Sequence, residues 1–525
     1  MASGSLRQGP SERTIPNGRA TAALLILFVI STCAFTYEFA VSAQHGYLVG
    51  DSTRHLIVNM AIMIVAMGIG QFCSRWVNWQ EVAIVRNELL VALVGGNANL
   101  ALYAVWVHLP EAAGSLGLLY AFVLGVLNGL QGPLFLRLVN SAGLSLREAS
   151  AWVSLPDFLS VIPACGIYLW LLRGPGMVMG SYLVGMLNVA TACMALFVFQ
   201  EQIQGRARKG LLALAAGVLV ILFAGYTWGD LAVTGLEQRF YTGRIIHRQQ
   251  TPFQRIILTE QRGRIHLFLN GNLQFAEADE HRYHEALVHI PMAAAGTVER
   301  ILILGGGDGL AAREVLKWPQ VKRIDLVEID PAVTTLAAHH PQLRRINGGS
   351  LQDPRLTVIH ADAFKWLETA TESYDTILVD LPDPNNINLA KLYTREFYAM
   401  AAARLAPHGI MAVQSTSPYA AREAFWMVVR TVAAAGLDVL PYHLYVPSFG
   451  DWGFTLAGRR PLSPAAIGPL PPEVATRYLT PATTAALFVF PPDTADQGRA
   501  ISTLMRPLIV EAYARGWQEW QSDGG

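Results

Sequence analysis

Charge is scarce in this sequence and unevenly distributed. Only 15% of the 525 residues are Asp, Glu, Lys or Arg, whereas soluble domains average about 25%. Residues 20–230 contain 18 charged side chains, and residues 231–525 contain 56. This contrast excludes a single globular domain and a disordered chain. Basic and acidic residues are equal at 39 each, which excludes a nucleic-acid binder that works through bulk positive charge.

Cysteine is also scarce. The chain has four, which all lie in apolar runs, and residues 231–525 contain none. Their spacing matches no metal-ligand pattern, so we predict no metal site, and the pattern does not indicate a redox compartment. The four are Cys33, Cys73, Cys165 and Cys193.

Long apolar runs fill the first part of the chain. Most have the roughly 20 residues that a helix needs to cross a lipid bilayer. We therefore predict a polar tail at 1–19 and a multi-pass α-helical membrane domain at 20–230 with about seven helices. The runs cover 20–45, 55–75, 88–108, 114–136, 149–172, 176–199 and 210–229.

The fifth run is the weakest, because Pro156, Asp157 and Pro163 interrupt it. An ionisable residue within a membrane span is a candidate functional ion. The alternative is that Asp157 lies at a helix end near the membrane interface, and we favour this alternative.

Basic residues indicate an orientation for the predicted spans. The N-terminal tail and the even-numbered loops have more Arg and Lys than the odd-numbered loops, which puts the N-terminus in the cytoplasm. Seven spans from that start place the remainder of the chain on the opposite side. A cleaved signal in the first run would leave that side unchanged.

The second part of the chain changes to alternating strands and helices. Residues 231–290 predict a small β-domain, in which Asn270-Gly271-Asn272 between two apolar runs is a strong hairpin signal. Residues 291–460 alternate buried strands with helices, which predicts a mostly parallel sheet with right-handed crossovers. Residues 461–525 form a C-terminal extension. The expected fold is thus a membrane domain, a small β-hairpin domain and an α/β Rossmann-like domain of the S-adenosylmethionine methyltransferase type.

A glycine-rich loop, Gly305–Gly309 (GGGDG), follows the first strand of the α/β region. Such a loop lets the backbone approach a ligand closely. Glu328 ends the next strand, at about the spacing where a carboxylate reaches ribose hydroxyls. Asp362 and Ala363 end the third strand, where they would meet an adenine edge. The three strand ends predict adenosyl binding, most economically S-adenosylmethionine chemistry.

Acidic residues surround this predicted nucleoside site. Asp308 lies within the glycine loop, and Asp380 and Asp383 follow the fourth strand. His284 and Glu285, on a helix predicted at 279–289, would add polar groups to the same cleft. Several carboxylates suit a polycationic substrate, because each ammonium gains a counter-charge. The alternative role of any single Asp is helix capping or turn formation, which weighs most for Asp383.

These motifs occur together in one known family. Residues 235–490 resemble the polyamine aminopropyltransferases, the spermidine synthases, and the apolar leader is similar to their membrane-bound bacterial branch. The matching segments include 270–274 (NGNLQ), 303–309 (ILGGGDG), 327–330 (VEID), 380–384 and 414–415.

The resemblance implies transfer of the aminopropyl group of decarboxylated S-adenosylmethionine to putrescine, which gives spermidine and methylthioadenosine. It implies no prosthetic group, and a homodimer. Asp380 would accept the proton. Gln254, Glu328, Asp362 and Ala363, with Gly305 and Gly307 of the loop, would hold the nucleoside, and His284, Asp308 and Asp383 would hold the amine.

The acidic loop departs from the family pattern. Leu381 and Pro382 replace small hydroxyl residues, and Asn385 and Asn386 replace a Gly-Pro turn. These departures bear on the identity of the acceptor more than on the reaction type, so transfer to another polyamine is one alternative. A membrane-anchored S-adenosylmethionine-dependent methyltransferase and a polyamine sensor or transporter without turnover are the others. The family's substrates are cytosolic, so we expect the catalytic domain on the cytoplasmic side of the inner membrane, against the charge count.

Overall fold

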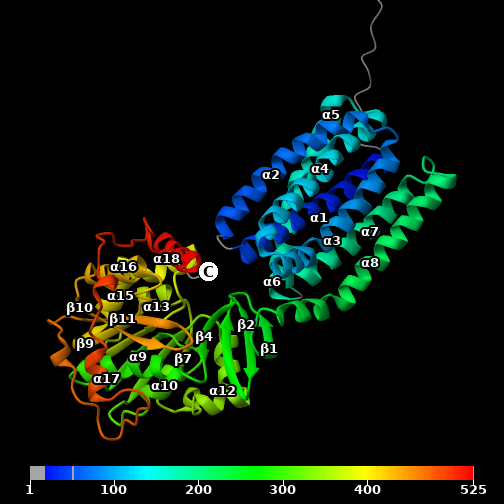
Figure 1. Ribbon diagram of the computed structural model, residues 1–525. Helices are drawn as coiled ribbons and strands as arrows, with labels where there is room; N and C mark the ends of the chain where they lie inside the picture. The colour runs from blue at the N-terminus through cyan, green and yellow to red at the C-terminus, as the bar shows by residue number, and fades with distance from the viewer. Residues whose placement is uncertain (1–17, 50–51, 175, 524–525) are drawn as a thin grey trace, which may run out of the picture. The chain divides into compact units, whose positions relative to one another are not determined.

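The computed structural model describes residues 18–49, 52–174 and 176–523, and the chain divides into two compact units between Thr242 and Gly243 (Figure 1). The predicted boundary at residue 230 falls too early, because the last helix of the first unit continues to Glu237. The helices of the first unit are α1 (Gly18–Val49), α2 (Ser52–Cys73), α3 (Gln80–His108), α4 (Pro110–Ser141), α5 (Leu146–Leu159), α6 (Val161–Arg173), α7 (Gly176–Val198) and α8 (Gly205–Glu237).

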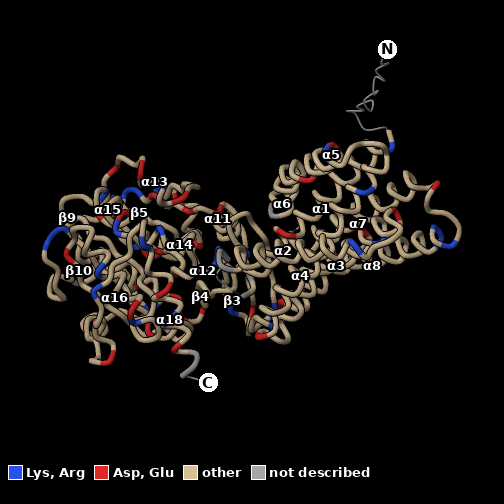
Figure 2. The backbone as a smooth tube through the Cα atoms, turned by 90° about the horizontal axis from the view of Figure 1, so that it is seen from above, with Lys and Arg blue, Asp and Glu red and all other residues tan. Residues whose placement is uncertain are grey.

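Seven helical segments of the described residues are long and apolar enough to cross a membrane. The predicted number of spans is confirmed on these grounds of length and composition. Figure 2 shows the long tan stretches of these helices, which few charged residues interrupt. The fifth segment, Leu146–Leu171, consists of α5 and α6, which meet at Ser160.

Asp157 lies in the last turn of α5, as the favoured interpretation expects of a helix-end residue. Its carboxylate accepts a hydrogen bond of 2.6 Å from Ser31 Oγ of α1. The helix end falls inside the segment Leu146–Leu171 rather than at one of its ends. Asp157 therefore links two helices within the first unit.

The second unit begins with a four-stranded antiparallel sheet in the order β1-β2-β3-β4. Asn270 and Gly271 join β3 to β4 with φ angles of 51° and 83°, as the Asn-Gly signal predicts. Apolar side chains such as Ile256 and Phe275 pack against Leu310, Val333 and Leu343 of the following domain, so the two parts share a core. The strands are β1 (Arg244–Gln250), β2 (Arg255–Gln261), β3 (Arg264–Leu269) and β4 (Asn272–Ala276).

The predicted α/β region is a seven-stranded sheet in the order β10-β11-β9-β8-β5-β6-β7. Strands β5 to β9 are parallel, and β11 pairs antiparallel with both neighbours, which confirms the predicted mostly parallel sheet. The strands are β5 (Arg300–Gly305), β6 (Arg323–Glu328), β7 (Leu356–His360), β8 (Tyr374–Asp380), β9 (Leu405–Gln414), β10 (Asp438–Val446) and β11 (Gly450–Gly458).

Helices cover both faces of this sheet. In β5, Ile301 and Ile303 enter one apolar core, and Leu302 and Leu304 enter the core on the opposite face, because successive strand residues point to opposite sides. The helices are α9 (Glu280–Ala294), α10 (Leu310–Val315), α11 (Pro331–His339), α12 (Pro341–Ile346), α13 (Ala363–Thr369), α14 (Ile387–Ala390), α15 (Arg395–Ala403), α16 (Arg422–Ala433), α17 (Pro481–Ala486) and α18 (Ile509–Asp523).

The predicted C-terminal extension is part of the α/β domain. Ile509 and Ala512 of α18 are almost fully buried in the core that includes residues of α15 and α16. The carboxyl ends of β5, β6 and β8 meet at one edge of the sheet, which is where open α/β sheets bind ligands. Both the extension and this edge contribute to the site described next.

Candidate active site

The glycine-rich loop joins β5 to α10 and contacts two carboxylates. A Cβ at Gly306 would lie 3.1 Å from Asp380 Oδ2, and one at Gly307 would lie 2.8 Å from Glu328 Oε2. Gly305 pairs with Asp380 across β5 and β8 and has a φ of 86°, a conformation that glycine adopts without strain. The loop therefore needs glycine so that the side chains at the ends of β6 and β8 can lie against its backbone.

Asp380 is the central carboxylate of the site. The hydroxyl of Tyr283, from α9, donates a hydrogen bond of 2.6 Å to Asp380 Oδ1. Burial raises the pKa of Asp380 to about 6; the positive charge of His284 and the Tyr283 hydrogen bond oppose this, and the like charge of Asp308 adds to it. The aspartates predicted at positions 308 and 380 thus lie within electrostatic range of each other.

Asp308 is partly buried, and its Oδ1 accepts a hydrogen bond of 2.9 Å from the backbone N–H of Leu310 at the start of α10. Burial raises the pKa of Asp308, although the charge of His284 opposes the shift. The capping role that the sequence offered as an alternative is therefore present. Asp308 serves it from a position that also faces the charged groups of the site.

His284, on α9, lies within electrostatic range of the two aspartates. Its Nδ1 is 3.0 Å from Glu280 Oε2 and 2.8 Å from the Glu280 carbonyl oxygen. Burial alone would lower the pKa of His284, but Glu280, with smaller contributions from Asp308 and Asp380, raises it to about 9. His284 is therefore an imidazolium at neutral pH, and it offsets the charge of the two aspartates.

A guanidinium fixes the partner of His284. Arg313 Nη1 and Nη2 each donate to one oxygen of Glu280 at 2.9 Å, which is a bidentate pair. Burial raises the pKa of Glu280, but His284 and Arg313 outweigh it and lower the pKa to about 2. A chain of alternating charges thus runs from Arg313 through Glu280 and His284 to the aspartates.

Asp383 is a further partly buried carboxylate, three residues after Asp380. It accepts hydrogen bonds from Gln414 Nε2 at 2.9 Å and Thr416 Oγ1 at 3.3 Å, and a third from the side chain of Tyr513. Burial raises the pKa of Asp383 to about 6, although these donors oppose the shift. Tyr513 belongs to α18, so the C-terminal extension supplies a side chain to the acidic group.

Hydrogen bonds hold the acidic loop in place. The carbonyl oxygen of Leu381 accepts from Gln414 Nε2 at 2.8 Å, and that of Pro382 accepts from the hydroxyl of Tyr393 at 2.9 Å. The side chain of Asn386 accepts from the backbone N–H groups of the first turn of α14. The loop is therefore held by its own backbone and by a short helix.

Glu328 and Gln254 lie on the predicted nucleoside side of the loop. Glu328 Oε1 accepts from the backbone N–H of Asp330 at 3.0 Å, and burial raises the pKa of Glu328 to about 7. Gln254 and Thr251, which connect β1 to β2, both donate to Asp330 Oδ2, at 3.0 and 2.8 Å. Asp330 therefore attaches the small sheet to the end of β6, beside Glu328.

Asp362 caps α13 by accepting from the N–H of Phe364 at 2.9 Å, and it forms an ion pair with Lys391. Burial raises the pKa of Asp362, but Lys391 and the backbone donors outweigh it and lower the pKa. Ala363 is buried as the first residue of α13. The sequence did not predict that Asp362 caps α13 or that it pairs with Lys391.

Glu285 does not face the cleft, so its predicted contribution there is wrong. Its carboxylate accepts hydrogen bonds from the backbone N–H groups of Arg477, Tyr478 and Leu479, at 2.6, 2.9 and 3.0 Å. Neighbouring residues of a helix point in directions about 100° apart. His284 and Glu285 therefore cannot both face the aspartates.

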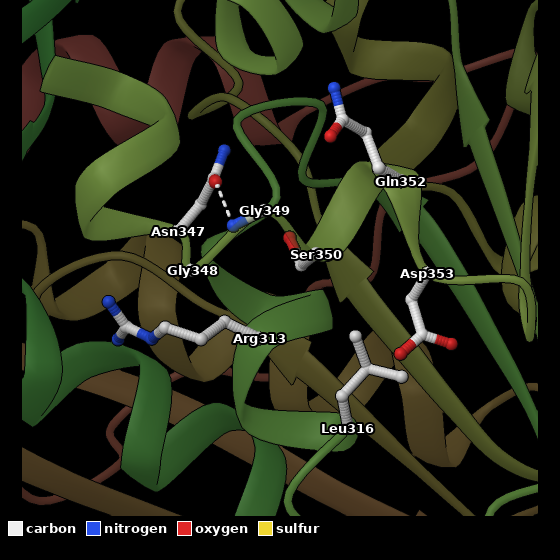
Figure 3. A pocket seen from close by; sticks show the side chains of 8 residues that line it. All are labelled: Arg313, Leu316, Asn347, Gly348, Gly349, Ser350, Gln352 and Asp353. Carbon is white, nitrogen blue, oxygen red and sulfur yellow. Dashed lines mark hydrogen bonds between the residues drawn. The ribbon is translucent and has the colours of Figure 1, made fainter. Parts of the chain in front are cut away.

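A cavity of about 280 Å³ lies behind the glycine loop (Figure 3). Its lining residue Asn347 donates to the carbonyl oxygen of Asp308 at 3.0 Å, and Ser350 Oγ donates to that of Gly309 at 2.6 Å. Asn347 also accepts from the N–H of Gly349, as the dashed line in Figure 3 marks. These residues support the loop, and the cavity is not lined by the aspartates of the site.

Four features of the site were not predicted from the sequence. The hydrogen bond from Tyr283 to Asp380 was not expected from the sequence. Glu280 and Arg313 offer a partial signal, since Glu280 and His284 are four residues apart on one helix. Lys391 and Tyr513 gave no signal, because they are distant in sequence from the carboxylates that they contact.

The fold and the site define a group-transfer enzyme with a glycine loop and acidic strand ends on a mostly parallel, Rossmann-like sheet. A spermine/spermidine synthase domain is recognised over residues 280–462. Two relatives are the polyamine aminopropyltransferase of Oceanobacillus iheyensis, 36% identical over 94% of this chain and 96% of its own, and polyamine aminopropyltransferase 1 of Streptomyces coelicolor, 38% identical over 95% and 94%.

This chain belongs to the polyamine aminopropyltransferase family. A solved spermidine synthase in complex with the transition-state analogue AdoDATO is 27% identical, covers 47% of this chain and 86% of its own, and has a TM-score of 0.44.

Proposed function

We propose that this enzyme transfers the aminopropyl group of decarboxylated S-adenosylmethionine to putrescine, and releases spermidine and methylthioadenosine. The observation that carries the proposal is the pair of partly buried aspartates, Asp308 and Asp380, beside a glycine loop that contacts Glu328. The methionyl end of S-adenosylmethionine has an ammonium and a carboxylate, whereas decarboxylated S-adenosylmethionine keeps only the ammonium. Acidic side chains attract the ammonium and repel the carboxylate, so the site favours the decarboxylated donor.

The nucleoside of the donor would lie along the ends of β5, β6 and β7. Partly buried Glu328 has a raised pKa of about 7, and ribose hydroxyls are donors that would stabilise its charged form. Gly305 and Gly307 allow the donor to approach the backbone, and Gln254, Asp362 and Ala363 would complete the nucleoside site. Gln254 is held beside Glu328 through Asp330.

The amines would be held by the carboxylates rather than by His284. An imidazolium repels an ammonium, so His284 acts as the counter-charge of Asp308 and Asp380 until the amines bind. Asp308 would take the ammonium of the aminopropyl arm, and Asp383 the distal ammonium of putrescine. Each buried carboxylate then has a cationic partner, which is the condition under which burial of charge is tolerated.

Asp380 is the proposed general base. It takes one proton from the near ammonium of putrescine, which frees the nitrogen lone pair. That nitrogen attacks the aminopropyl carbon next to sulfur, so the N–C bond forms as the C–S bond breaks. The electrons of the broken bond stay on sulfur, and the sulfonium becomes the neutral thioether of methylthioadenosine. A pKa of about 6 leaves Asp380 ionised at neutral pH, where a base is required.

The test is a product assay with the full chain purified in detergent. Decarboxylated S-adenosylmethionine is incubated with putrescine and with longer diamines and polyamines, and the products are identified by mass. Spermidine from putrescine supports the proposal. If another acceptor is preferred, that amine takes the place of putrescine in the proposal. Methyl transfer from S-adenosylmethionine would reject the proposed aminopropyl transfer.

Asp380→Asn is the matched variant for the role of the base. We expect turnover to fall about 100- to 10,000-fold, with binding of methylthioadenosine unchanged, because Asn preserves shape but accepts no proton. Glu372→Gln, in a half-exposed ion pair with Arg300, is the control. Near-normal turnover of Asp380→Asn would reject its assignment as the base.

We also propose a location and an assembly. The apolar helices α1 to α8 would anchor the enzyme in the inner membrane. The catalytic unit would lie on the cytoplasmic side, where the substrates of the family are found. The enzyme would be a homodimer. A reporter fused after residue 525 tests the side. Activity of a reporter that works only outside the cytoplasm would reject this orientation, and a monomer mass by light scattering would reject the dimer.

A further inference from the structure

The helical unit contains a carboxylate that is buried and half satisfied. Glu88 lies in α3, its side chain is 0% exposed, and Gln131 of α4 donates to Oε1 at 2.6 Å. The other oxygen, Oε2, has no hydrogen-bond partner among the described residues. A buried carboxylate without a donor or counter-charge costs several kcal/mol. Oε2 therefore requires a donor that the described chain does not provide.

A second unsatisfied side chain lies beside Glu88 on α4. Asn128 precedes Gln131 by three residues, so the two share one face of the helix. Asn87, next to Glu88, donates to the carbonyl oxygen of Leu127 at 2.9 Å, which holds these turns of α3 and α4 together. Both amide atoms of Asn128 are buried without a hydrogen-bond partner in the described part of the chain.

Helix α7 packs antiparallel along α3. Asn99, late in α3, donates to Ser181 Oγ, early in α7, at 2.7 Å. Further along α7, a Cβ at Gly185 would lie 3.2 Å from the carbonyl oxygen of Ala92. The next turn of α7 therefore lies level with the turn of α3 that precedes Ala92.

These turns bring Asn188 of α7 level with Glu88, and α1 adds Tyr37. Asn188 is 0% exposed, and neither of its amide atoms has a hydrogen-bond partner among the residues described. The Tyr37 ring packs on Gly95, two turns beyond Glu88 on the same face of α3, and lies within electrostatic range of Glu88. Its hydroxyl is likewise unpartnered within the described ranges. Four helices thus direct unsatisfied polar groups to one level of the unit.

The buried acidic and basic side chains of this interior are unequal in number. Glu38 is 8% exposed and Glu88 is 0% exposed, whereas no Lys or Arg of the described residues before Gly243 is buried. A cation is the group that would pair with Glu88 here and stabilise its ionised form. Carboxylate, amide and phenol oxygens are all hydrogen-bond acceptors, so they suit a cation that carries several N–H donors.

We propose that Glu88, with Gln131, Asn128, Asn188 and Tyr37, binds the ammonium end of a primary amine within the helical unit. The ammonium has three N–H donors and no acceptor. One donor meets Glu88 Oε2, and the amide and phenol oxygens accept the others. The choice of putrescine as the probe rests on the proposed function, because diamines are the cations that this enzyme would encounter. The site itself rests on the helical unit alone.

The test counts binding sites for radiolabelled putrescine on the full chain in lipid nanodiscs, without the aminopropyl donor. Two sites per chain are expected in the wild type, one in each unit. Glu88→Gln removes the counter-charge, and we expect binding at one site to weaken about 100-fold, with aminopropyl transfer unchanged. Glu88→Asp keeps the charge and should retain both sites. Glu111→Gln, an exposed carboxylate at the start of α4, is the control.

Each outcome separates this proposal from the catalytic one. A single wild-type site that Glu88→Gln leaves intact would overturn the inference. Absence of aminopropyl transfer would reject the proposed function, and the amine count would still decide the role of Glu88. If Glu88→Gln folds poorly, Tyr37→Phe is measured: about tenfold weaker binding at one site supports the site, and unchanged binding overturns it.

Discussion

The hydroxyl of Tyr283 donates a hydrogen bond of 2.6 Å to Asp380, the carboxylate that we propose as the general base. Tyr283 is nearly buried on α9 and Asp380 ends β8, so the contact joins the helix before the sheet to its catalytic edge. A donor to a carboxylate stabilises the charged form and lowers its pKa. Tyr283 therefore keeps Asp380 ionised despite its burial.

Tyr283→Phe removes this donor and raises the pKa of Asp380 above its value of about 6. Because the base must be ionised, we expect the acid limb of kcat/KM to move to higher pH by about one unit. Activity at pH 9 should remain close to that of the wild type. The pH profile is measured beside that of Tyr445→Phe, an exposed tyrosine; an unmoved acid limb would show that Tyr283 does not tune Asp380.

Gly307→Ala places a Cβ 2.8 Å from Glu328 Oε2, closer than real Cβ atoms approach other atoms. Glu328 must move, and the proposed contact with the ribose is lost. We expect methylthioadenosine to bind about 10- to 100-fold more weakly by calorimetry. Gly296→Ala, whose Cβ would have 4.0 Å to its nearest neighbour, is the control. Equal affinities of the two variants would contradict this role of the loop.

Tyr513→Phe removes one of three donors to Asp383. A hydrogen bond to a charged group contributes about 1.5–3 kcal/mol, so we expect the KM for the amine to rise about tenfold with kcat within about twofold. The Tyr513 donor lowers the pKa of Asp383, which is about 6. Its loss should therefore raise that pKa, so that the increase in the amine KM on acidification begins at a higher pH. Arg515 is on the same helix and forms an exposed ion pair with Glu423 of α16. Arg515→Ala should change neither the KM for the amine nor its pH dependence. A fall in kcat without a change in KM would reject amine binding by Asp383.

Glu280→Gln tests the charge of His284 through stability. The folded pKa of His284 is about 9, above the unfolded value of about 6.5. The ion pair therefore stabilises fully below about pH 6.5 and is lost as the pH rises through about 9. We expect the loss in unfolding free energy, up to about 3 kcal/mol at pH 6, to shrink toward pH 9.5, where the missing contact with Arg313 remains. A difference independent of pH would mean that His284 is neutral.

Elements with strong local signals could be predicted from the sequence. The Asn270-Gly271 hairpin follows from two positions that tolerate positive φ, and the parallel strands follow from short apolar runs that end in polar residues. Asp308 and Asp380 come together because they follow strands that are adjacent in the sheet. Local pattern and strand adjacency therefore located the carboxylates.

Contacts between distant segments could not be predicted in the same way. Nothing near Asp362 in the sequence indicates Lys391, and nothing near Asp383 indicates Tyr513. The charge of His284 depends on Glu280, which in turn depends on Arg313. Glu285 is assigned wrongly for a related reason, since its partners are backbone groups of the C-terminal extension. Protonation and side-chain direction depend on such partners, which a linear pattern does not reveal.

The contribution of α18 has a consequence for biosynthesis. A ribosome translates Tyr513 long after Asp383, so a nascent chain would carry an incomplete acidic group even once its sheet has formed. Premature termination before α18 would remove Tyr513 from the acidic group and Ile509 and Ala512 from the core. Full competence is thus coupled to the completion of translation.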